Sequence, residues 1–194
     1  MQKLTRDDLL SLEQYSEERP AFRDRVMAHK KNRRLDLGTN AALYFEDRLT
    51  MQYQIQEMLR IERIFEADGI NEELDVYNAL VPDGSNLKAT FMIEFPEVEE
   101  RQQMLEQLVG IEDRVYVQVA DFDRVFAISD EDLDRADENK TSAVHFMRFE
   151  FPPEQSASLR AGASLVAGID HENCRVEISP VPDNIRRSLL NDLN

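Results

Sequence analysis

The chain has 194 residues, one cysteine and a formal net charge of −16 at pH 7. This length is sufficient for a domain with its own hydrophobic core, and a single cysteine excludes an intramolecular disulfide and a metal site built from several thiolates. The negative charge argues against general nucleic-acid binding, and no apolar run approaches the roughly 20 residues of a membrane span, so we expect a soluble cytoplasmic protein.

The first 82 residues are predicted to be mainly helical. Apolar residues recur at helical spacing, with Ser, Thr, Asp or Asn where each helix would begin. A short apolar run at 41–45 is a candidate strand. The expected helices cover residues 5–10, 16–37, 47–67 and 71–80, with Gly38 and Gly69 as stop signals.

Three polar side chains fall on the apolar faces of these helices. His29 and Arg33 share a face with the apolar residues of helix 16–37, and Glu62 lies in the apolar stripe of helix 47–67, whereas Glu57 and Arg60 lie outside it. A buried carboxylate is costly unless it is paired, so we expect Glu62 to meet Arg33 or His29 across a helix contact. The group is either a structural ion-pair network or a site that orients a small anionic or polar ligand.

A basic segment interrupts the acidic chain between residues 19 and 34. It contains a single acid, Asp24. Such a segment indicates an anion site or a counter-charge for carboxylates elsewhere, and the alternative is a solvated helix face paired with its own acidic neighbours. Its bases are Arg19, Arg23, Arg25, Lys30, Lys31, Arg33 and Arg34.

From residue 83 the apolar period changes to two, and one pattern occurs twice. Residues 88–129 and 142–179 both give a strand, a Glu-Phe-Pro triplet, a helix and a hairpin. The sequence therefore predicts an α+β protein in which a helical part, 1–82, packs on a duplicated strand-helix-strand-strand part, 83–194. We expect the two parts to share one core, and the two copies to be related by a pseudo-twofold axis with a ligand cleft between them.

Charged residues on the predicted non-core face of the duplicated strands are candidates for that cleft. Glu94 and Glu150 occupy equivalent positions, and Arg148 lies on the same face as Glu150. Two nearby carboxylates would have separated pKa values suited to acid and base chemistry, and the alternative is that each braces the helix after its proline. The complete set of predicted ligand-binding residues is His29, Arg33, Glu62, Glu94, Arg148 and Glu150.

A metal site is the second hypothesis. His145 is expected on the core side of its strand, whereas Asp170 and His171 lie at a hairpin turn. No pair has the HxxxH or ExxH spacing of common metal sites, and no nucleophile or phosphate-binding motif occurs. A metal-dependent enzyme would use His29, Glu62, His145 and His171, with Asp170 as a further candidate ligand.

Four stretches together resemble one bacterial domain-of-unknown-function family of about this length. They are HKKNRRLDLG from His29, YFEDRLTMQYQIQEMLRIERIF from Tyr44, EELDVYNALVPDGSNLKATFMIEFPE from Glu72 and VHFMRFEF from Val144. The resemblance implies genes near those of rubrerythrin-like and iron-sulfur oxidoreductase-like proteins, and hence an accessory role in redox or peroxide metabolism. The chain lacks the repeated ExxH pattern of rubrerythrin.

The first hypothesis is therefore a non-catalytic binding or accessory protein. It would hold a small ligand between the repeats or dock on a redox partner through Lys30, Lys31, Arg33 and Arg34. The cofactor is left open, and a homodimer is an open alternative.

Overall fold

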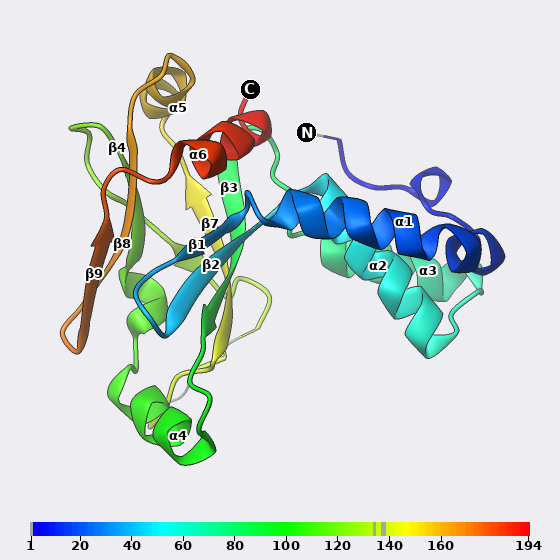
Figure 1. The fold of residues 1–194 in the computed structure, drawn as a ribbon, viewed down its shortest axis with the longest axis horizontal. Helices are drawn as coiled ribbons and strands as arrows, with labels where there is room; N and C mark the ends of the chain where they lie inside the picture. The colour runs from blue at the N-terminus through cyan, green and yellow to red at the C-terminus, as the bar shows by residue number, and fades with distance from the viewer. Residues whose placement is uncertain (1, 134, 137–138) are drawn as a thin grey trace.

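The computed structural model describes residues 2–133, 135–136 and 139–194. Two antiparallel sheets form two layers, and an arm of three helices projects from one side of them (Figure 1). The α+β class predicted from the sequence is confirmed.

The helical arm begins with the short 3-10 helix η1 (Arg6–Asp8) and contains α1 (Leu12–Lys30), α2 (Arg48–Glu62) and α3 (Ala67–Asn78). The Ser11 side chain accepts a hydrogen bond from the Gln14 amide, so α1 starts earlier than expected and Pro20 lies inside the helix. At α2, Asp47 and Thr50 cap the helix reciprocally.

Two helix ends differ from the prediction. The chain leaves α1 at Lys30 because residues 34–36 form β1 (Arg34–Asp36), which pairs with β2 (Ala41–Glu46). Gly38, with φ 81°, makes the turn between these strands and does not end a helix. Helix α2 ends at Glu62 because Arg63 adopts a left-handed conformation, with φ 57°.

The first sheet has the strand order β1-β2-β3-β7-β6, and the second has β5-β4-β8-β9. Helix α4 (Val98–Gln107) and helix α5 (Pro153–Arg160) lie at opposite ends of the sheets (Figure 1). The remaining strands are β3 (Asn86–Ile93), β4 (Val115–Val119), β5 (Val125–Phe126), β6 (Ile128–Ser129), β7 (Val144–Glu150), β8 (Leu165–His171) and β9 (Cys174–Ile178), and the remaining helical segments are η2 (Ile111–Arg114), α6 (Asp183–Leu189) and η3 (Leu190–Asp192).

The main hydrophobic core fills the space between the two sheets. Phe91 and Phe149 from the first sheet and Val117 and Leu165 from the second are fully buried in one cluster. Burial of this kind supplies about 1.5–3 kcal/mol for each large apolar side chain. The space between the two sheets is therefore filled by apolar side chains.

The strand pairing places corresponding strands of the two predicted copies side by side. Strand β3 pairs with β7 and β4 pairs with β8, both antiparallel. Thr90 lies opposite Phe146. The sequence distance from Thr90 to Phe146 equals that from Glu94 to Glu150, so Thr90 and Phe146 are also equivalent positions in the predicted repeat. The duplication itself stays a prediction.

The helical arm has hydrophobic clusters of its own. Ile55 and Leu59 belong to one cluster, and Tyr15 and Val26 belong to another. The core of the sheets includes neither. Strands β1 and β2 of the first part contribute Leu35 and Phe45 to the core of the sheets, while the helices pack on one another, so the expectation of one shared core stays a prediction. Over the part of the chain that is described, no helix has the length and apolar character needed to cross a membrane.

Candidate functional site

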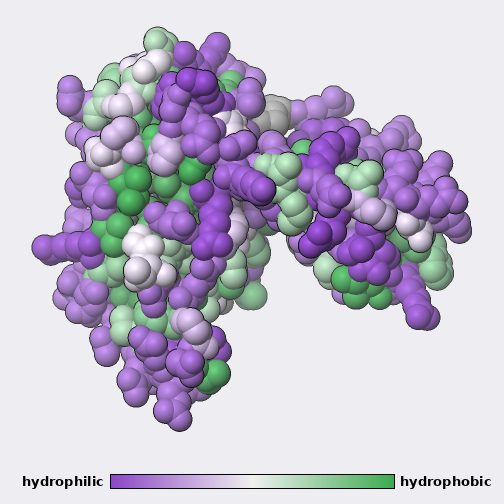
Figure 2. All heavy atoms as spheres, in the orientation of Figure 1, coloured by the Kyte–Doolittle hydropathy of each residue, from purple (hydrophilic) through white to green (hydrophobic). Residues whose placement is uncertain are grey.

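A groove of about 540 Å³ lies between the end of α3 and the outer face of strands β3 and β7. Tyr77 and Leu80 form its helical side, and Lys88, Phe146 and Arg148 project from the sheet. Alternation along β3 and β7 buries every second residue in the core, so these three residues face outward. Figure 2 shows that the surface is hollowed between the arm and the sheets.

Lys88 is the unusual charge of this groove. The residue is half-buried, and no hydrogen bond or ion pair is found for its ammonium group among the described residues. Burial lowers its pKa below the ordinary value, and Arg148 acts in the same direction against the attraction of Glu131. The site thus holds a cation at the edge of an apolar surface, and no described residue forms an ion pair with it.

The two arginines of the groove are neutralised by their neighbours. Arg148 donates two hydrogen bonds to Glu131, at 2.8 and 2.9 Å, and a third to Glu150 at 2.6 Å. Arg135 donates to both carboxylate oxygens of Asp132, at 2.6 and 2.7 Å. Paired in this way, they leave Lys88 as the groove cation with unused hydrogen-bonding capacity.

The groove wall is fixed by a carboxylate behind it. Asp130 accepts hydrogen bonds from the Phe146 amide at 3.0 Å and from Arg135 at 3.1 Å. The Arg135 guanidinium lies over the Phe146 ring, 4.5 Å from its centroid. Asp130 therefore determines how Arg135 and Phe146 present themselves to the groove.

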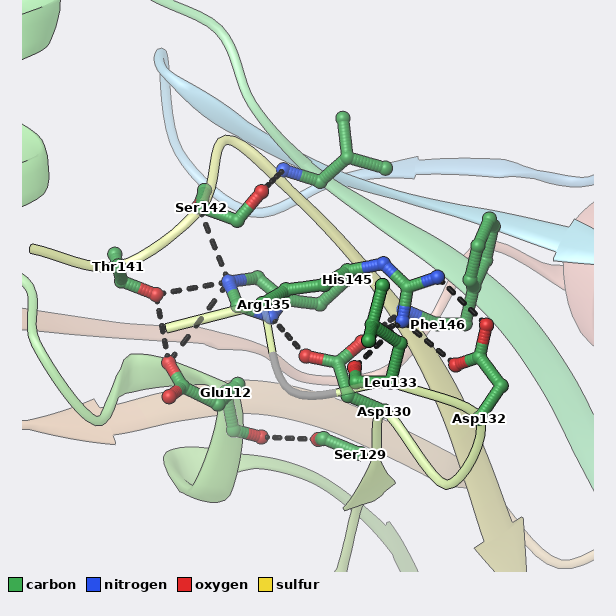
Figure 3. A network of polar contacts seen from close by, with 11 residues as sticks. Glu112, Ser129, Asp130, Asp132, Leu133, Arg135, Thr141, Ser142, His145 and Phe146 are labelled. Carbon is green, nitrogen blue, oxygen red and sulfur yellow. Dashed lines mark hydrogen bonds and ion pairs between the residues drawn. The ribbon is translucent and has the colours of Figure 1, made fainter. Parts of the chain in front are cut away.

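A buried polar network holds Asp130 in turn (Figure 3). His145 is fully buried, and its Nδ1 lies 2.5 Å from the Asp130 carboxylate. Its Nε2 lies 2.8 Å from the Thr141 hydroxyl and 3.0 Å from the Ser142 carbonyl. Thr141 donates its own proton to Glu112 at 2.8 Å. Both ring nitrogens therefore lie within hydrogen-bonding distance of oxygen atoms.

Asp130, His145 and Thr141 are arranged like the acid, base and hydroxyl of a catalytic triad. Their burial does not suit catalysis. Thr141 is 2 % exposed and His145 is 0 % exposed, so a substrate has no access to the hydroxyl. The network links η2 and the segment after β6 to strand β7. We interpret it as a clamp that holds the groove wall on the sheet.

His29 and Arg33 lie together, but in a different cluster from the groove. The His29 Nε2 is 2.5 Å from Asp47, and Arg33, 2 % exposed, forms ion pairs with Asp47 and Asp192. Burial raises the pKa of Asp192 to about 6, and Arg33 acts against this rise. The ion pair thus offsets part of the desolvation cost and joins the segment between α1 and β1 to η3.

The prediction that Glu62 faces inward and meets His29 or Arg33 is wrong. Glu62 is exposed at the last position of α2, where the packing stripe ends. Glu57 takes the inward place instead. It accepts hydrogen bonds from Tyr15 at 2.7 Å and from Arg19 at 2.7 and 2.9 Å, and these bonds hold its pKa near 2.

The basic segment serves partly as internal counter-charge. Arg33 is buried, so it cannot form the predicted docking surface. Arg34 pairs with Asp36 and Glu94. A redox partner at Lys30 and Lys31 stays a prediction.

Glu94 and Glu150 do not meet. Because β3 and β7 are antiparallel, Glu150 lies opposite Asn86, at the far end of the strand pair from Glu94. Glu94 accepts a hydrogen bond from Tyr44 at 2.6 Å, and Glu150 accepts bonds from Asn86 and Arg148. The predicted pair of cooperating carboxylates is therefore wrong, while Arg148 and Glu150 do lie at or beside the groove.

The predicted metal ligands are also dispersed. Asp170 pairs with Arg124 at 3.0 Å, whereas His171 contacts the Val109 carbonyl and accepts a hydrogen bond from the Asn173 amide. His145 is enclosed in the network described above. No three His, Cys, Asp or Glu side chains within 2–133, 135–136 and 139–194 come together as metal ligands would.

A second apolar cavity of about 360 Å³ lies between β1, β2, α4 and β9. Cys174 lines it, and burial raises the pKa of that thiol. Glu100 is the sole charged residue on its rim among the described residues. The cavity therefore has room for a small ligand but few charged groups that could bind it.

Sequence reasoning missed Lys88, Asp130 and Thr141. Strand alternation from Phe91 places Lys88 on the same outer face as Thr90, and this signal was available in the sequence. Asp130 and Thr141 lie in an acidic loop that gave no periodicity, so their contact with His145 needed the fold.

Comparison with known proteins identifies relatives without a described activity. A sequence model of a family described as "Protein of unknown function (DUF3501)" matches residues 3–193. A crystal structure of a protein of unknown function from Burkholderia pseudomallei K96243 is 50% identical in sequence, covers 100% of both chains and superposes with a TM-score of 0.94. A search of curated proteins gives no match. The resemblance found in the sequence is confirmed, and the redox link that it implies stays a prediction.

Proposed function

The chain belongs to the DUF3501 family, and we propose that it is a non-catalytic binding protein that holds a small, largely apolar molecule in the groove between α3 and strands β3 and β7. The observation that carries the proposal is an outward-facing apolar surface of pocket size whose wall is held by a buried network.

The groove has the size and composition of a small-molecule site. Its volume of about 540 Å³ lies within the range of roughly 300–1,000 Å³ that is usual for ligand pockets. Tyr77, Leu80 and Phe146 provide apolar contact area, and Lys88 provides a polar group at the edge. Further charged side chains line the groove beside this apolar area, and an apolar surface with placed polar groups is typical of sites that bind and orient a ligand.

The rigidity of the wall favours binding. Arg135 and Phe146 are fixed by Asp130, which His145 fixes in turn. A preformed wall loses little conformational entropy when a ligand binds. The groove also lies across β3 and β7, which come from different copies of the predicted repeat, so the proposal keeps a ligand at their junction but on the outer face.

A neutral fluorescent probe tests the proposal. We expect N-phenyl-1-naphthylamine, which fluoresces in apolar surroundings, to bind the protein with one site. Ala79 lines the groove and is exposed, so Ala79→Trp should fill the groove and weaken binding at least about tenfold.

The matched control is Ala157→Trp on the exposed side of α5, which should leave probe binding unchanged. The probe is excited directly, so the new tryptophan does not contribute to the signal, and circular dichroism checks that both variants fold. Equal binding by both tryptophan variants would place the probe elsewhere and refute the groove as the site.

A further inference from the structure

We propose that the ligand of this groove is an amphipathic monoanion, whose apolar body lies on Phe146 and Tyr77 and whose negative group is bound by the Lys88 ammonium. This inference rests on the proposed binding function and adds the chemical class of the ligand.

The ammonium group of Lys88 has unused hydrogen-bonding capacity. A half-buried ammonium can donate three hydrogen bonds, and none is made to the residues that the structure describes. Burial without a partner is unfavourable, so an anion that enters the groove would replace lost hydration with a charge-assisted hydrogen bond.

The acids that line the groove are paired with arginines or exposed to solvent. Glu131 is bound by Arg148 through both oxygens, and Asp132 is bound by Arg135 in the same way. Asp75 lies on the exposed side of α3, where water screens its charge. Glu131, Asp83 and Glu150 attract Lys88 electrostatically, but no hydrogen bond or ion pair joins its ammonium to a described residue, so the ammonium can bind an incoming anion.

The positive charge of Lys88 and the apolar surface of the groove together select the class of ligand. With Arg148 and Arg135 already paired, Lys88 is the one groove cation without a hydrogen-bond partner among the described residues, and it lies beside apolar side chains. A dianion or a strongly polar ligand would leave charge or hydrogen-bonding groups unsatisfied against Phe146 and Tyr77. A monoanion with an apolar body satisfies both parts of the groove.

Two probes with the same ring system separate the charge from the apolar body. 8-Anilino-1-naphthalenesulfonate carries one sulfonate, and N-phenyl-1-naphthylamine carries none. On the natural protein we expect the sulfonate probe to bind about tenfold more tightly than the neutral probe, which corresponds to about 1.4 kcal/mol.

Lys88→Met removes the ammonium and keeps an unbranched side chain that is one atom shorter. The variant should bind the sulfonate probe about tenfold more weakly and the neutral probe within about twofold of the natural protein. Lys88→Arg should retain most of the preference for the sulfonate probe, because a positive donor is restored. Lys31→Met, at an exposed lysine outside the groove, removes the same formal charge and should change neither affinity.

The outcomes distinguish the two proposals. If neither probe binds in the groove, as judged with Ala79→Trp, the binding function itself fails and this inference fails with it. If the neutral probe binds there but Lys88→Met leaves the sulfonate affinity unchanged, the groove is a binding site and the anion assignment is refuted. Equal losses in Lys88→Met and Lys31→Met would show a general charge effect and would also refute the assignment.

Discussion

The contact between α1 and α2 should depend on the ionised form of Glu57. Hydrogen bonds from Arg19, then from Tyr15 and Arg60, lower the pKa of Glu57 from an ordinary value of 4.5 to about 2. Since one pKa unit corresponds to about 1.4 kcal/mol, the full difference would correspond to about 3.4 kcal/mol. Arg19 is one-third exposed, so solvent screening reduces the expected contribution to about 1–2 kcal/mol.

Glu57→Gln should therefore lower the free energy of unfolding by about 1–2 kcal/mol at pH 7. A carboxylate with a lowered native pKa stabilises the fold above the unfolded pKa, and this stabilisation is lost as the pH falls from about 4.5 towards 2. The difference between the natural protein and Glu57→Gln should accordingly be constant from pH 7 to about pH 5.5 and should shrink towards pH 3.

Urea unfolding followed by circular dichroism at each pH measures this difference without adding salt that would screen the pair. Glu62→Gln is the matched control, because Glu62 is exposed on the same helix, and it should change stability by less than about 0.5 kcal/mol. If the Glu57→Gln difference is as large at pH 3 as at pH 7, the ionised carboxylate is not its cause.

Two further substitutions test the buried networks. His145→Phe would leave Asp130 facing an apolar ring and should lower the free energy of unfolding by about 3–5 kcal/mol in urea titrations. The neutral probe should also bind more weakly, because Asp130 no longer holds the groove wall. A loss of stability below about 1 kcal/mol would contradict the interpretation of the network as a clamp. Arg33→Met should cost a similar amount because it leaves Asp192 buried without a cation, and adding Asp192→Leu should restore part of the stability in thermal or urea unfolding, whereas additive losses would argue against the pairing.

Much of the local structure could be predicted from the sequence because it depends on neighbouring residues. The start of α2 follows from Asp47 and Thr50, whose side chains cap the helix three residues apart. The inward orientation of His145 follows from strand alternation. These signals lie within one element and need no knowledge of what packs against it.

The errors arose where a partner from another element decides the outcome. A helical wheel puts Glu62 on the apolar stripe, but the left-handed conformation of Arg63 ends the helix there and Glu62 is exposed. Glu57 is inward because Tyr15 and Arg19 reach it from α1, which the sequence pattern of α2 alone does not reveal.

The groove was only partly accessible to sequence reasoning. Arg148 was predicted as a ligand-binding residue and Lys88 shares its face, but their neighbours Tyr77 and Leu80 come from the helical arm. The position of α3 over the sheet is a tertiary property, which the sequence pattern of neither element reveals. The place of the candidate site therefore required the structure.

The separate hydrophobic clusters of the arm and the sheets have a consequence for cooperativity. Tyr77 and Leu80 pack on a cluster of the arm, whereas Met147 belongs to the core of the sheets, and all three line the groove. A bound molecule would touch both bodies at once, so its binding energy would be lost whenever either one opened. A ligand bound in the groove would thus couple the opening of the helical arm to the opening of the sheets, so that the two would open together.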